Sequence, residues 1–295
     1  MERALRSVLM QSLQPLEIIV VNDGSTDSSR AIVERVIAEN PESNIRLITQ
    51  QNSGVSAARN RGIAEAKGDY VALLDADDWW LSGYIAEVCR MWEYYPDADA
   101  YSTAFDIVSG DSRVSARVPE CEGYINPAAE ALQSRYPIIP STATLRRSAV
   151  MECGGFPEGM RIGEDQWLWV RMMQRGCRFA FSPMSLVRYS REASNRSATI
   201  YRSEQTQYSL DMLYDPLQSE VLNEYIARIA IGKAITQSVR GGTEDARRVA
   251  ERFSYTRLSC RQLRRLRILN ALPVALRSVA DGLYSSLAWL IRRKG

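Results

Sequence analysis

The sequence contains no histidine. Triads that use an imidazole base and most zinc centres are therefore excluded, so a general base must be a carboxylate, Lys, Tyr or Cys, and a metal must be held by oxygen ligands. The five cysteines are odd in number, lie far apart and form no CxxC pair. This pattern argues against a disulfide framework or a zinc site and is typical of a reducing compartment.

A large excess of either charge is also absent, because 37 basic residues oppose 35 acidic ones. The overall balance therefore does not indicate a nucleic-acid partner. No apolar run approaches the roughly 18 residues of a spanning helix, and the start "MERALRSVLMQSL" lacks the pattern of a signal peptide. We expect a cytoplasmic protein, or one that lies on the inner face of a membrane.

The first third of the chain alternates between two hydrophobic periods. Short β-branched runs at 16–23, 44–50 and 69–75 predict strands, and the segments 26–40 and 54–68 have helical spacing. Strands that are continuously apolar and separated by helices predict an α/β fold whose sheet is covered on both faces. We expect a mixed, mostly parallel sheet.

The pattern changes after about residue 190. Strand patterns end there, and from about residue 196 only helical spacing follows. We therefore expect an α/β domain over 1–192 and a helical region over 193–295. The end of that region, 257–295, holds nine Arg or Lys and one acid, Asp281.

The stretch "LLDADDWW" places three aspartates directly after the third predicted strand. Open α/β sheets bind ligands at the carboxyl ends of their strands. Asp75 and Asp77 have the chemistry to share a divalent cation with phosphate oxygens and water. The alternative is structural: Asp77 or Asp78 caps the next helix. Capping accounts for one aspartate but does not need three.

Two further polar clusters follow the first two strands. In "VVNDGSTDSS", Asp23 ends a strand, and its carboxylate is suited either to a turn or to hydrogen bonds from a nucleobase or ribose. In "NSGVSAARNRG", Arg59 lies on the helix that leads to the strand carrying Asp75. That arginine either faces solvent or points into the same crevice.

A carboxylate pair opens the helix in "GEDQWLWVRM". Glu164 and Asp165 would stabilise a helix N-terminus through its dipole, and this alone could explain them. In a chain without histidine, however, a carboxylate beside a Trp-rich wall is the most available general base.

Taken together, in this order and spacing, these motifs resemble the family 2 glycosyltransferases of the GT-A fold. The resemblance covers most of residues 4–190. It implies an inverting transfer of a sugar from a nucleotide-sugar, with UDP as the expected nucleotide, to an acceptor hydroxyl in glycan or polysaccharide biosynthesis. The expected acceptor is either a glycan or a lipid-linked molecule.

The resemblance also implies roles for individual residues. Asp23, Arg59 and Asn52 correspond to contacts with the nucleotide-sugar. Asp75 and Asp77 correspond to the DXD pair, in which Asp75 also contacts the ribose and both hold Mg²⁺ or Mn²⁺ on the diphosphate. Asp165, with Glu164 beside it, corresponds to the catalytic base that deprotonates the acceptor.

One departure from the family concerns the N-terminus. Family members begin with a hydrophobic strand in the middle of the sheet, whereas Met1 falls where the first helix has already begun. We expect that strand to be missing and the true start to lie upstream. Its two neighbours would then either keep unpaired edges or be forced together across a gap. The alternative function is an inactive or binding-only relative impaired in donor binding. A sugar nucleotidyltransferase would need an N-terminal Gly-rich phosphate loop, which the sequence lacks.

The basic end, 257–295, combines arginines with Leu, Ile, Val and Trp at helical spacing. Such a segment is suited to an anionic membrane surface. The alternative is that its helices pack on the rest of the protein or bind a partner and show solvent a basic face.

Overall fold

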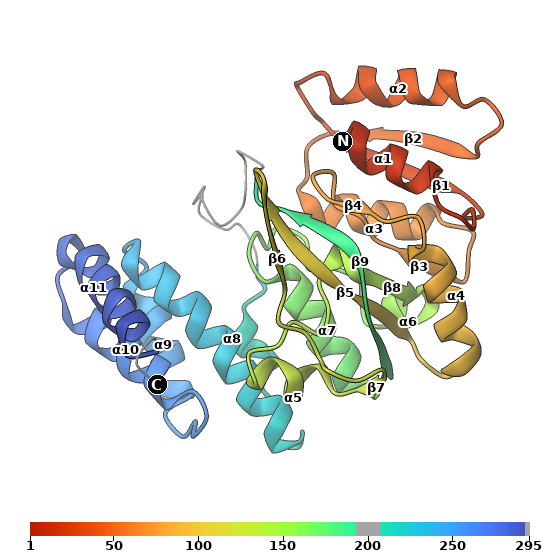
Figure 1. Ribbon diagram of the computed structural model, residues 1–295. Helices are drawn as coiled ribbons and strands as arrows, with labels where there is room; N and C mark the ends of the chain where they lie inside the picture. Colours follow the sequence, from red (N-terminus) through yellow and green to blue (C-terminus); the bar gives the residue numbers. More distant parts are fainter. Residues whose placement is uncertain (193–206, 293–295) are drawn as a thin grey trace. The chain divides into compact units, whose positions relative to one another are not determined.

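The chain divides into two compact units, Met1–Gln207 and Tyr208–Gly295 (Figure 1). The computed structural model describes residues 1–192 and 207–292, and in the last helix it describes side chains only to residue 284. The boundary expected at 192/193 borders the segment 193–206, which lies outside the described residues.

A small parallel sheet begins the first unit. Strand β1 (Ile18–Asp23) pairs with β2 (Ile45–Gln50) in parallel. Helices α1 (Glu2–Leu9) and α2 (Ser29–Glu39) share an apolar cluster with one face of these strands. Helix α3 (Val55–Glu65) packs along β1. Both faces of the pair are therefore covered, as the apolar strands predict.

The larger sheet has seven strands, with the order β3-β8-β5-β9-β4 along its main path. Strand β6 pairs with β5, and β7 pairs with β9. The strands are β3 (Tyr70–Ala72), β4 (Trp79–Trp80), β5 (Ala100–Ser109), β6 (Ser112–Ser115), β7 (Gly123–Ile125), β8 (Ala143–Arg146) and β9 (Phe179–Ser190).

The α/β class is confirmed, but the expectation of a mostly parallel sheet is wrong. Among the pairings of the described strands only β1–β2 and β5–β9 are parallel. The reason is that β8 runs antiparallel between β3 and β5, while β4, β6 and β7 add antiparallel edges. In the described part of the chain β1 pairs only with β2, and β3 only with β8. This matches the first of the two expected alternatives, unpaired strand edges.

Helices cover the two faces of the larger sheet. On one side α4 (Tyr84–Tyr94) buries Tyr84 and Met91 completely. On the other, α7 (Glu164–Gln174) joins an apolar cluster with Val150 of α6 (Arg147–Glu152). The short α5 (Pro127–Leu132) begins at Asn126, whose side chain caps it. Ile63 of α3 and Leu73, just after β3, belong to the same apolar cluster as α7.

Strand β3 is shorter than predicted, since it ends at Ala72 instead of residue 75. Beyond it the N–H of Leu73 donates to the carbonyl of Ala143 (2.9 Å), and that of Asp75 to Ser141 Oγ (3.1 Å). The chain therefore leaves the ladder as a loop that β8 and its preceding 3₁₀ turn (Pro140–Thr142) support. This loop carries the three aspartates.

The second unit is helical over its described residues. Helices α8 (Glu220–Val239), α9 (Thr243–Arg252), α10 (Cys260–Ala271) and α11 (Val274–Arg292) follow the 3₁₀ turn Leu210–Leu213. Helix α8 is buried over most of its length and packs with α9 and α10. Buried Glu224 accepts hydrogen bonds from Thr256 Oγ1 and the Arg257 N–H, which fixes the chain just before α10.

Candidate active site

Arg59 is the centre of the candidate site. Its side chain is only 10% exposed, and its guanidinium reaches from α3 to two carboxylates on other elements. One nitrogen, Nη2, donates to Asp75 Oδ1 (2.8 Å), and the other, Nη1, to Glu164 Oε1 (3.1 Å). Of the two alternatives for Arg59, solvent or the crevice of Asp75, the structure shows the second, and the arginine joins that loop to the start of α7.

The charges of this triplet depend on one another. Burial acts to lower the pKa of Arg59, but the charges of Asp75 and Glu164 outweigh it and raise that pKa. The guanidinium therefore stays ionised. Its central carbon lies 5.2 Å from the ring centroid of Phe156, so an aromatic face covers one side of it. Removing the Arg59 guanidinium would leave the carboxylates of Asp75 and Glu164 near one another without a compensating charge.

The carboxylate pair lies in the first turn of α7. Gly163 precedes it with φ +84°, a left-handed conformation that favours glycine. Burial and the charge of Asp165 raise the pKa of Glu164 to about 7, against the opposing charge of Arg59. Burial likewise raises the pKa of Asp165. Both acids thus titrate at a higher pH than usual, as a base working near neutrality requires.

The two acids differ in their partners. Glu164 is held by Arg59, whereas Asp165 accepts a hydrogen bond from the neighbouring Gln166 N–H (2.8 Å). In the described part of the chain, no hydrogen bond or ion pair to another element engages the Asp165 carboxylate. Asp165 is therefore better placed than Glu164 to accept a proton from a substrate.

Asp23 organises the loop that precedes α3. Its Oδ1 accepts from Gln50 Nε2 (2.8 Å) and the Ser53 N–H (2.9 Å), and its Oδ2 accepts from the Gly54 N–H (2.8 Å). Asn52 is exposed in this loop. A Cβ at Gly24 would lie 2.8 Å from the Asn52 nitrogen, so the close approach of the two segments requires glycine. Asp23 and Asn52 thus lie side by side, although no hydrogen bond in the described residues joins them to Arg59.

Asp77 lies in the same loop as Asp75. Its carbonyl accepts a hydrogen bond from Arg3 Nη2 (3.2 Å), and the Arg3 guanidinium lies 3.6 Å from the ring centroid of Trp79. Carboxylates at 75 and 77 are hard oxygen donors that suit Mg²⁺ or Mn²⁺. Among the described residues no group of three or more acids or cysteines is arranged to hold a metal. A cation here would need diphosphate oxygens and water to complete its coordination.

Asp78 is a buried support and not a helix cap. Helix α4 begins six residues later, after Gly83. The Asp78 side chain instead accepts hydrogen bonds from Ser141 Oγ (2.5 Å) and the Ser190 N–H (2.8 Å). Burial raises its pKa to about 7. Since Ser141 also accepts from the Asp75 N–H, Asp78 ties the aspartate loop to the end of β9.

Asn60 is a positioning residue to which the sequence pattern assigned no role. Its Nδ2 donates to the Phe156 carbonyl (2.9 Å), and its Oδ1 accepts from the Phe156 N–H (2.8 Å). A Cβ at Gly155 would lie 2.7 Å from Asn60 Oδ1, so glycine is needed here too. Asn60 therefore clamps the loop before Glu164 onto α3. The adjacency of Arg59 and Asn60 was visible in sequence, but the partner 96 residues away was not.

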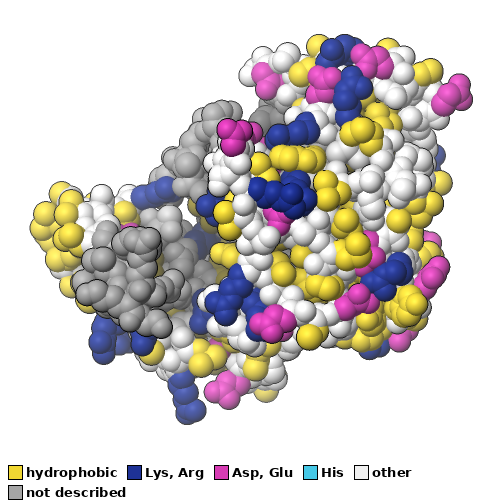
Figure 2. All heavy atoms as spheres, in the orientation of Figure 1, with side chains coloured by type: hydrophobic (Ala, Val, Ile, Leu, Met, Phe, Trp, Pro, Cys, Tyr) yellow, Lys and Arg dark blue, Asp and Glu magenta, His cyan; other side chains and the backbone are white. Residues whose placement is uncertain are grey.

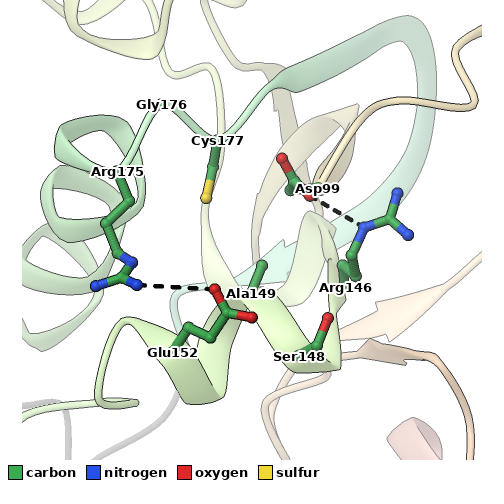
Figure 3. A pocket seen from close by; sticks show the side chains of 8 residues that line it. All are labelled: Asp99, Arg146, Ser148, Ala149, Glu152, Arg175, Gly176 and Cys177. Carbon is green, nitrogen blue, oxygen red and sulfur yellow. Dashed lines mark hydrogen bonds and ion pairs between the residues drawn. The ribbon is translucent and has the colours of Figure 1, made fainter.

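A separate cavity of about 300 Å³ lies at the other end of α7, beyond its C-terminus (Figure 3). Its lining contains two ion pairs, Arg146–Asp99 (3.0 Å) and Arg175–Glu152 (3.7 Å). The other lining residues are Ser148, Ala149, Gly176 and Cys177. Because its charges already compensate each other and it contains none of the predicted site residues, this cavity is not the candidate site.

Comparison with known families agrees with this arrangement. The family model described as "Glycosyl transferase family 2" matches residues 1–154 of the 295. The match contains Asp23, Arg59 and the aspartate loop. The chain belongs to this family.

Curated relatives include an uncharacterized glycosyltransferase, alr2836, from Nostoc, which is 35% identical over 113 residues, 38% of this chain and 34% of that protein. The succinoglycan biosynthesis protein ExoU from Rhizobium meliloti is 26% identical over 60% of this chain and 54% of its own. The chain spans about a quarter to a third of the length of the first relatives it matches.

Solved structures share the fold. TarS from S. aureus, residues 1–349 in complex with UDP, aligns with a TM-score of 0.67 and 17% identity over 96% of this chain and 87% of that one. GalNAc-T7 with UDP, GalNAc and Mn²⁺ aligns with a TM-score of 0.55 and 16% identity, over 78% of this chain and 48% of that one. At these identities the likeness confirms the GT-A fold alone.

The role of Asp78 predicts a stability effect. Asp78→Ala removes the acceptor for Ser141 and Ser190, so we expect the free energy of unfolding to fall by roughly 2–4 kcal/mol, measured by urea denaturation. Asp78→Asn keeps an acceptor oxygen and should lose less. Asp111→Ala, at an exposed hairpin position, is the matched control. A loss for Asp78→Ala no larger than for the control would contradict the supporting role.

Proposed function

We propose that this protein is an inverting glycosyltransferase that moves a sugar from a UDP-sugar to a hydroxyl of a glycan or lipid-linked acceptor. The observation that carries the proposal is the Arg59 bridge, which joins Asp75 to Glu164. It brings a loop with the chemistry of a diphosphate-binding site next to a pair of carboxylates with raised pKa. Polysaccharide biosynthesis as the setting is supported by the name of ExoU.

Donor binding is assigned to the loops at the ends of β1, β2 and β3. In the proposal Asp23 and Asn52 line the nucleoside side, and Asp75 lies toward the ribose and diphosphate. The support from solved neighbours is that the titles of TarS structures print UDP and UDP-GlcNAc. In the donor complex Arg59 would keep its ion pair with Glu164, while its ion pair with Asp75 would weaken as Asp75 turns to the donor.

A divalent cation, Mg²⁺ or Mn²⁺, fits the donor set of Asp75 and Asp77, and the GalNAc-T7 title prints Mn²⁺ beside UDP. When bound, such a cation neutralises charge that develops on the departing diphosphate. The chain's own contribution is to hold the loop. The Ser141 hydroxyl fixes the Asp75 backbone, and Arg3 fixes the Asp77 carbonyl.

Asp165 is the proposed base. Direct displacement with inversion requires the acceptor oxygen to attack from the face opposite the leaving group while one carboxylate takes its proton. Glu164 supports Asp165 in two ways. It holds Arg59 in place, and its negative charge and that of Asp165 each disfavour ionisation of the other, which raises the pKa values of both. A cytoplasmic location on the inner face of a membrane is also proposed, because the chain's basic helical end has exposed arginines.

One observation favours a second candidate, a binding-only relative. Strand β1, which carries Asp23, lies in a sheet separate from β3 and its aspartate loop. If the two loops are not held at the spacing of one nucleotide, a donor would bind weakly or without turnover. The assay below separates this candidate from an active enzyme.

Transfer and donor hydrolysis should be measured with a panel of nucleotide sugars, with Mg²⁺ or Mn²⁺ and with EDTA. We expect turnover with a UDP-sugar, and a fall in kcat of about 10²-fold or more for Asp165→Asn, because a positioned base contributes that much. Asp77→Asn should mainly raise the KM for the donor and the cation requirement. Unchanged kcat in Asp165→Asn refutes the assignment of the base, and donor binding without turnover identifies the binding-only candidate.

The raised pKa values predict an acidic limb in the pH profile. Below its pKa the base Asp165 carries a proton, so kcat/KM should rise with pH along an acidic limb, which burial of Asp165 places above the usual range of an aspartate. Glu164→Gln removes a negative neighbour of Asp165 and leaves the positive charge of Arg59 less compensated. Both changes lower the pKa of Asp165, so the limb should move to lower pH. Thermal stability measured across the same pH range controls for unfolding. If the limb does not move, Glu164 does not influence the pKa of the base.

A further inference from the structure

The hairpin formed by α10 and α11 has exposed arginines on its first helix and exposed apolar side chains on its second. We call it the hairpin surface and define it by Arg261, Arg264 and Arg267 on α10 and Leu276, Val279 and Leu283 on α11. The arginines recur every three residues. The apolar residues follow the i, i+3, i+7 spacing that places side chains along one stripe of a helix.

The three arginines of the hairpin surface are distinct from other arginines of the same segment. Arg265 pairs with Asp281 (2.6 Å), and Arg277 is buried, where it donates to the Ser238 carbonyl (3.0 Å) and to Thr243 Oγ1 (2.9 Å). Those two residues fasten α11 to α10 and α8. In the described part of the chain, Arg261, Arg264 and Arg267 have no ion pair with an acid.

The apolar side chains of the hairpin surface are exposed to solvent over more than half of their surface. Leu276, Val279 and Leu283 are 54%, 62% and 68% exposed. Buried Arg277 sets the rotation of α11, because its hydrogen bonds to α8 fix which side of the helix faces inward. The stripe therefore faces outward as a consequence of the fold.

The charge pattern differs from that of the first unit. Figure 2 shows Lys and Arg side chains next to Asp and Glu over the visible face of the first unit. Several of its exposed arginines pair with acids, for example Arg30 with Glu34 (2.7 Å) and Arg61 with Glu65 (2.8 Å). The three arginines of the hairpin surface, by contrast, have no acid partner in the described residues, and an apolar stripe at helical spacing lies on the next helix.

We infer that the hairpin surface binds an anionic phospholipid surface. Arginine heads match lipid phosphates in charge, and the Leu and Val side chains would enter the interface between headgroups and acyl chains. A second copy of the chain is disfavoured, since it would bring three more arginines into the contact and no acid to compensate them. A nucleic acid would match the arginines but leave the apolar stripe in water. Among the described helices none is long and apolar enough to cross a bilayer.

The inference is tested with the full chain and vesicles of phosphatidylcholine, with and without about one third phosphatidylserine or phosphatidylglycerol. We expect co-sedimentation with the anionic vesicles only. Replacing Arg261, Arg264 and Arg267 by Gln should weaken binding on the order of 100-fold, from about fivefold for each arginine near the surface. Replacing Leu276, Val279 and Leu283 by Gln should weaken it about tenfold or more.

The matched control replaces Arg30, Arg35 and Arg61 by Gln, which removes the same charge from exposed helical positions of the first unit. It should bind vesicles like the unchanged protein. Helicity by circular dichroism and transfer to a soluble acceptor should be unaltered in the hairpin variants, so that loss of vesicle binding is distinguishable from loss of folding or of the proposed chemistry.

Three outcomes would overturn the inference. The first is no binding of the unchanged protein to anionic vesicles. The second is equal loss in the control and the arginine variant, which would indicate a net-charge effect. The third is a dimer, seen by light scattering, that the Leu276, Val279 and Leu283 replacements dissolve, which would identify a second copy of the chain as the occupant.

Discussion

A positive charge buried between two loops is the interaction on which the candidate site depends. The positive charge of Arg59 is tolerated in its largely buried position because Asp75 and Glu164 compensate it. The two acids in turn come close to each other only because the cation lies between them. This mutual requirement determines where α3, the aspartate loop and the start of α7 lie, and it couples the region assigned to the donor to the region assigned to the base.

Uncharged contacts hold this charged centre in place. Asn60 holds the loop before α7 through two hydrogen bonds to the backbone of Phe156. Ser141 links the Asp75 backbone to the buried carboxyl of Asp78. Such contacts contribute geometry without adding net charge, which leaves the electrostatics of the site to the residues that would meet a substrate.

Much of the fold was predictable because hydrophobic periodicity reports burial directly. The strand preceding Asp23 and the helix carrying Arg59 were found within a few residues. The direction of β8 was not predictable, since pairing between strands distant in sequence leaves little local signal. The early end of β3 at Ala72 has the same origin: the backbone of the next residues finds partners outside the ladder, at Ala143 and Ser141.

The sequence by itself determined the family, the α/β class and the residue types available for chemistry, because motif order, hydrophobic period and the lack of histidine are local properties of the chain. Only the tertiary structure decided which partners those residues have and which of them are buried. It gave Arg59 two carboxylate partners, made Asp78 a support and placed Arg277 inside the helical unit, apart from the exposed arginines of α10. The physical reason is that burial and charge compensation depend on which distant side chains meet, and the spacing along the chain does not contain that information.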